Sequence, residues 1–159
     1  MLAVLRISFI AALLTVGSFG QQSQPPGLSQ AAVVGPAEKA AIAALNFHQG
    51  DAEEFRRARG DFTAGGWTDF MKHMQGFLDA NGAPTFTSSF VALHSATVLD
   101  EKGGVLHFRI PGTLTQSNKL GKTTYRAAIE VYALLSPGKA TKIQHLEQIT
   151  CGATSTKCQ

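Results

Sequence analysis

Apolar residues recur with two different periods along the chain, and the change of period divides it into a helical part and a strand part. Between Pro36 and Leu78 they recur every three or four residues, which is typical of amphipathic helices. From Thr85 onward they recur every second residue, as in strands with one buried face. Helices followed by strands indicate an α+β domain.

The helical part begins with residues 37–49, which are rich in alanine and follow Pro36, a residue suited to the first turn of a helix. Gly50 favours an end there, and Asp51 favours a new start that continues to about Arg59. The pattern allows either one bent helix or two.

Thr63 is the expected N-cap of the next helix. Asn81, Gly82 and Pro84 end it. The apolar stripe of this helix consists of Trp67, Phe70, Met71, Met74, Phe77 and Leu78. Helical spacing of this kind predicts a face packed against the core.

Short turns separate the strands, so the sequence predicts a four-stranded antiparallel meander with the helices on one face. The turns fall at residues 103–104, 118–121 and 136–138. The strands are expected at residues 86–99, 105–115, 123–135 and 141–150.

Alternation within the strands sorts side chains onto two faces. The face expected under the helices is almost purely apolar in the central strands: Leu106, Phe108, Ile110, Tyr125, Ala127, Ile129, Val131, Ala133 and Leu135. Arg109, Arg126 and Glu130 lie on the opposite, polar face. They are therefore the candidate residues for binding other proteins.

His145 and Glu147 share parity with Ile143 and Ile149, so the pattern places them on the inner face of the last strand. A histidine beside a carboxylate is either a general base or a structural polar pair. The sequence contains no nucleophile elbow, zinc-protease motif, P-loop or Cys–His arrangement. We therefore expect no enzyme activity, no cofactor and no metal.

Residues 1–20 predict export. Arg6 precedes an uncharged apolar stretch from Ile7 to Val16, and Ser18 and Gly20 suit a cleavage site. An uncleaved membrane anchor is the alternative. The apolar stretch is shorter than the run of about 20 apolar residues that a membrane span needs, which favours cleavage. The domain is accordingly expected in the periplasm or secreted, with the membrane as a partner only if the segment is uncleaved.

Composition divides the rest of the chain into a leader and one folded domain. Residues 21–36, rich in Gln, Ser, Pro and Gly, predict a flexible leader, and residues 37–150 suffice for a single domain. The formal net charge of +3 is scattered and no nucleic-acid motif appears, so nucleic acid is not an expected partner.

Both cysteines, Cys151 and Cys158, fall in the last nine residues. In an oxidising compartment this spacing predicts one local disulfide that closes the tail at residues 151–159.

A signature block reads Phe62-Thr63-x-x-Gly66-Trp67, and the second expected strand reads from Val105 to Pro111. With the order of elements over roughly residues 40–150, this resembles the periplasmic domain of the DotI/IcmL family, also called TraM, from type IVB secretion and conjugation systems. The resemblance implies a curved sheet wrapped by helices, like nuclear transport factor 2 or cystatin.

The resemblance also implies an assembly role through contacts with other protein subunits, with self-association left open. The block itself is interpreted as structural, with Thr63 capping, Gly66 allowing close approach and Trp67 filling space; partner contact is the alternative. The competing function is an exported ligand-binding or enzymatic domain of the same fold, such as a hydratase or isomerase relative.

We predict that Cys151 and Cys158 are paired in protein isolated without reductant. A loop this short contributes about 2–3 kcal/mol by chain entropy. Thiol titration of the denatured, unreduced protein should find no free thiol, and two titratable thiols would contradict the pairing.

Overall fold

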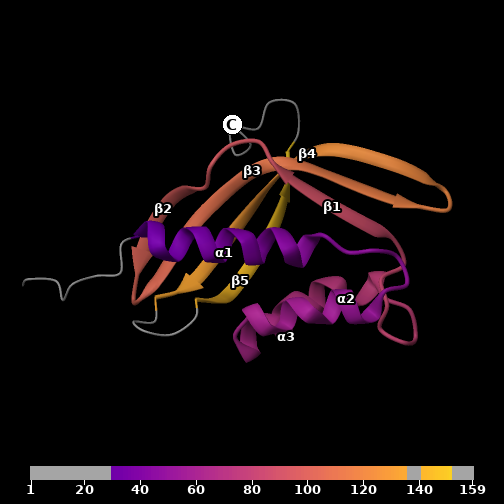
Figure 1. The fold of residues 1–159 in the computed structure, drawn as a ribbon, viewed down its shortest axis with the longest axis horizontal. Coiled ribbons are helices and arrows are strands. Elements are labelled where there is room, and N and C mark those ends of the chain that lie inside the picture. Colours follow the sequence, from indigo (N-terminus) through magenta and orange to yellow (C-terminus); the bar gives the residue numbers. More distant parts are fainter. Residues whose placement is uncertain (1–29, 136–140, 152–159) are drawn as a thin grey trace, which may run out of the picture.

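The computed structural model describes residues 30–135 and 141–151 (Figure 1). The expected export segment at residues 1–20 and Cys158 lie outside the described residues. The helices are α1 (Gln30–Leu45), α2 (Ala52–Arg57), η1 (Ala58–Asp61), α3 (Ala64–Met74) and η2 (Gln75–Phe77). The strands are β1 (Thr87–Ala92), β2 (Thr97–Lys102), β3 (Val105–Asn118), β4 (Gly121–Leu134) and β5 (Lys142–Thr150).

The first helix begins earlier than the sequence suggests. It starts at Gln30 and contains Pro36, so the end of the predicted flexible leader is helical instead. Val33 is only 2% exposed and belongs to the core cluster. Burial of an apolar side chain on this added turn offsets the unfavourable effect of a proline inside a helix.

α1 and α2 are two separate helices, which answers the question of one bent helix or two that the sequence left open. Gly50 has a φ of 81°, a left-handed conformation that glycine adopts at low cost, and it stands after α1. Asp51 then caps α2 by accepting a hydrogen bond from Glu54 N at 2.8 Å. Thr63 caps α3 by accepting from Gly66 N at 3.0 Å, as predicted.

The sheet has five antiparallel strands, because the first predicted strand is broken into β1 and β2. Both pair with β3, so they lie one after the other along the same edge of it (Figure 1). The break lies opposite Pro111, whose carbonyl accepts from Leu93 N. Proline has no N–H to donate toward this side, so the ladder cannot continue past it.

The helices cover one face of this sheet, with α1 running across it (Figure 1). Most side chains predicted for that inner face are fully buried: Leu106, Phe108, Ile110, Ala127, Ile129, Val131 and Ala133 are all 0% exposed. Tyr125 and Leu135, predicted for the same face, are half-buried and pack against this core. The α+β class predicted from the sequence is therefore confirmed.

Backbone contacts dock the start of α3 on the start of β5. Thr63 N donates to Ile143 O at 2.9 Å, and Phe62 forms a parallel bridge with Ile143. A Cβ on Gly66 would lie 2.6 Å from the carbonyl oxygens of both Ile143 and Gln144. Only glycine permits so close an approach.

We predict that Gly66→Ala destabilises the domain by about 1–3 kcal/mol, because the added methyl group forces α3 away from the β5 backbone. Gly65→Ala is the matched control, since a Cβ at Gly65 would meet nothing within 4 Å. It should be neutral or stabilise the helix by up to about 1 kcal/mol. Urea unfolding of both variants tests this, and equal stabilities would contradict it.

Candidate functional site

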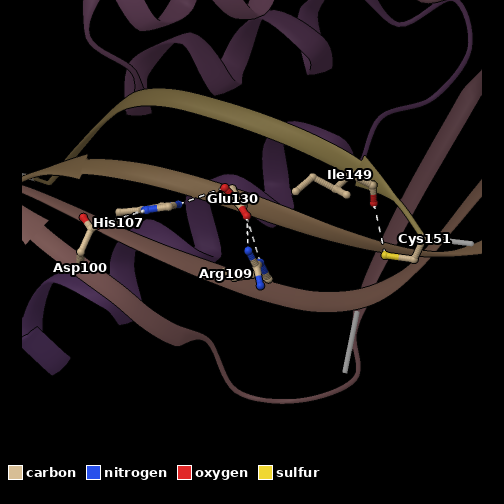
Figure 2. A network of polar contacts seen from close by, with 6 residues as sticks. All are labelled: Asp100, His107, Arg109, Glu130, Ile149 and Cys151. Atoms are coloured by element: carbon tan, nitrogen blue, oxygen red, sulfur yellow. Dashed lines mark hydrogen bonds and ion pairs between the residues drawn. The ribbon is translucent and has the colours of Figure 1, made fainter. Parts of the chain in front are cut away.

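A network of polar side chains lies on the outer face of the sheet (Figure 2). Arg109 on β3 stands directly opposite Glu130 on β4. Its Nε donates to Glu130 Oε1 at 3.0 Å, and its Nη2 contacts the same oxygen. His107 Nε2 lies 3.1 Å from Glu130 Oε2, while His107 Nδ1 lies 3.4 Å from Asp100 Oδ2 on β2.

The polar groups of this network pair mainly with one another. Glu130 is 7% exposed. Burial alone would raise the pKa of Glu130, but hydrogen bonds from Arg109 and His107 outweigh it and hold that pKa below its usual value. Tyr132 stacks on His107 with ring centroids 4.1 Å apart. Burial, followed by the nearby Glu130 charge, raises the pKa of Tyr132.

The predicted interaction face of Arg109, Arg126 and Glu130 therefore needs correction. All three lie on the outer face, as expected, but Glu130 is buried and Arg109 is committed to it. Arg126 is exposed, and its side chain has no partner among the residues that the structure describes. Of the three, Arg126 has the most accessible side chain, and the role of these residues in binding other proteins stays a prediction.

The predicted inner-face pair of His145 and Glu147 is wrong. A register shift in β5 leaves Gln144 without a partner, so His145 pairs with Tyr132 and Glu147 pairs with Glu130 on the outer face. His145 Nδ1 instead lies 2.6 Å from Asp69 Oδ2 of α3, which reaches it at the edge of the sheet. The extra residue of the bulge reverses the alternation.

A cavity of about 580 Å³ lies between α3 and the inner face of the sheet. Its deepest walls are buried apolar side chains, and the ionisable groups that line it, His73, His145 and Glu147, lie toward solvent. Within the described ranges, no group of three or more His, Cys, Asp or Glu side chains could hold a metal ion.

The residues of the signature block have structural contacts. Beyond the roles of Thr63 and Gly66 described above, Phe62 and Trp67 belong to an aromatic cluster under α3. The Trp67 ring centroid lies 5.6 Å from those of Phe62 and Phe70 and 5.9 Å from that of Phe55. Trp67 is half-buried, so part of it stays accessible.

Cys151 continues the ladder beyond β5, since its N–H donates to Arg126 O at 3.0 Å and its Sγ lies 3.7 Å from Ile149 O (Figure 2). Because Cys158 lies outside the described residues, the disulfide stays a prediction. None of the helices in the described part of the chain is long and apolar enough to cross a membrane.

Sequence reasoning missed the pairing of His107 and Arg109 with Glu130, although a signal for it exists. The turn at residues 118–121 sets the register of the β3–β4 hairpin, and counting back from Asn118 and Gly121 places Arg109 opposite Glu130. The contact of Asp69 with His145 has no such signal, because it depends on the bulge.

Comparison with solved structures finds the same fold in proteins of type IV secretion systems. The periplasmic domain of DotI matches with a TM-score of 0.62 and 21% identity, over 76% of this chain and 95% of that one. An IcmL-like type IV secretion system protein of Legionella pneumophila gives 0.60 and 15%, over 81% and 98%. CagV of Helicobacter pylori, a VirB8 homolog, gives 0.56 and 10%, over 76% and 99%.

The structural resemblance predicted from the signature block is thus confirmed at the level of the fold. No protein-family model matches the sequence, and no curated protein matches it.

We predict that Glu130→Gln destabilises the domain at neutral pH by about 2 kcal/mol, between the values for an exposed and a fully buried ion pair. Since the pKa of Glu130 is lowered on folding, its contribution is present above the ordinary value of 4.5 and is lost as the pH falls through the folded value. The stability difference from the unaltered protein should therefore shrink in acid.

Arg126→Gln is the control on the same face, and it should change stability by less than about 0.5 kcal/mol. Urea unfolding at pH 7 and at acidic pH measures both variants. A Glu130→Gln variant as stable as the unaltered protein at pH 7 would show that the network contributes nothing.

Proposed function

We propose that this chain is an exported, non-enzymatic assembly subunit that acts outside the cytoplasm by binding other proteins, as in type IVB secretion or conjugation systems. The observation that carries the proposal is the fold match, which extends over 95–99% of the DotI, IcmL-like and CagV domains. The match covers those solved chains almost end to end, which supports the same kind of role for this fold.

The chemistry of the cavity favours this role over catalysis. His145 is held by Asp69, and both side chains are more than a third exposed. Glu147 lines the cavity only as an exposed side chain of the edge strand β5, so no acid and base among the described residues lie together in the buried part of the cavity. General acid–base chemistry requires such groups within hydrogen-bonding reach of one bound molecule.

A row of outer-face residues is the best candidate for the contact surface. Val91 on β1 pairs with Thr113 on β3, which pairs with Arg126 on β4. Val91 is 58% exposed and Arg126 is exposed. We call these three residues the outer row. An accessible apolar side chain beside an arginine is the composition that protein interfaces favour.

We predict that Arg126→Glu weakens association with secretion or conjugation subunits of the same organism by about tenfold, equivalent to about 1.4 kcal/mol. Its melting temperature should stay nearly unchanged, because the side chain is exposed. The measurement is affinity purification of the tagged protein after crosslinking in cells, with the captured subunits quantified by mass spectrometry.

The matched control is Lys72→Glu, the same charge change at an exposed position of α3 on the helical side. It should leave the captured subunits unchanged. Equal capture by the unaltered protein and both variants would remove the outer row from the interface, and the absence of every such subunit would argue against the assembly role.

A further inference from the structure

The cavity between α3 and the sheet has an apolar interior of a size that suits a small molecule. Its walls include Leu45, Phe47, Phe70, Met74 and Leu146, each no more than 9% exposed. The volume of about 580 Å³ falls within the range of roughly 300–1,000 Å³ found for small-molecule sites.

The hydrogen-bonding groups on the inner face of this cavity are uncharged. Ser88 on β1 stands directly opposite Gln116 on β3. Toward the mouth, Gln148 Nε2 donates to Tyr125 Oη at 3.2 Å. All four residues line the cavity. His73, His145 and Glu147 also line the cavity, but none of them is buried. A charged molecule would therefore find no buried counter-charge among the described residues there, and burial of an unpaired charge is costly.

Ser88 provides the observation that points to a ligand. The residue is 5% exposed, and its backbone N–H and carbonyl are both used in the bridge with Phe47. No described residue hydrogen-bonds to its hydroxyl, which is not sealed away from the cavity. A nearly buried hydroxyl without a protein partner is stabilised by a hydrogen bond from whatever fills the space beside it.

We propose that this cavity binds a small, uncharged, mostly apolar molecule that carries a neutral hydrogen-bonding group for Ser88 and Gln116. The hollow continues beneath the β3–β4 hairpin, where Phe77, Phe86 and Tyr125 line both parts. An elongated molecule therefore fits best, with its polar group near Ser88 and its apolar body along the aromatic walls.

This site is separate from the proposed function. Ser88 and Gln116 lie on the inner face, whereas the outer row lies on the opposite side of the same strands. Loss of ligand binding need not affect partner binding, and the reverse also holds, so each proposal is tested by its own experiment.

The test is a fluorescence titration of the full chain with N-phenyl-1-naphthylamine, an uncharged apolar probe with one N–H group. We expect saturable one-to-one binding. Ser88→Leu fills part of the cavity and removes the hydroxyl, so it should weaken probe binding at least tenfold. The matched control is Ser89→Leu, on the exposed face of the same strand, which should bind as the unaltered protein does.

Two further arms complete the test. Gln116→Leu, at a half-buried position, should also weaken probe binding. If Ser88→Leu does not fold, this variant tests the proposed site in its place. The anionic probe 1-anilinonaphthalene-8-sulfonate should bind at least tenfold more weakly than the neutral one. Absence of saturable binding, equal binding by folded Ser88→Leu and Ser89→Leu variants, or equal affinity for the anionic probe would overturn the proposal.

Discussion

The approach of α3 to the β5 backbone is the constraint on which the rest of the structure depends. Gly66 brings the first turn of α3 against the carbonyl groups of Ile143 and Gln144, while Thr63 donates to the same strand. The contact sets where α3 lies over the inner face, and hence the width of the cavity between them. It also places Asp69 beside His145, so one glycine determines both packing and polar geometry.

Alternation in the sequence predicts the face of each side chain in β3 and β4, but not in β5 beyond the bulge at Gln144. The apolar alternation of β3 and β4 is uninterrupted, so Phe108 and Ile129 could be assigned to the core from parity alone. In β5 one extra residue reverses that parity, and nothing in the composition of the strand reports it. Leu146 and Gln148 therefore occupy the inner-face positions that parity gave to His145 and Glu147.

Burial on the polar face was also missed, for a different physical reason. Parity correctly placed Glu130 opposite the core, but parity reports only a direction and not what covers a side chain. Arg109 and His107 hydrogen-bond to that carboxylate, and Tyr132 stacks on His107; these contacts follow from the register of β3 against β4 and not from parity alone. Arg126, further along the same strand, lacks such neighbours among the described residues and stays open to a partner.

The break opposite Pro111 also bears on solubility. An unbroken edge strand presents a long row of unpaired backbone groups, which can recruit the edge of another molecule and lead to aggregation. Here that edge is divided into two short pieces, and Phe47 pairs with part of β1. The other piece, β2, carries Asp100, Glu101 and Lys102 in exposed positions. By breaking this edge into β1 and β2, Pro111 makes it a poorer template for pairing with a strand of another molecule.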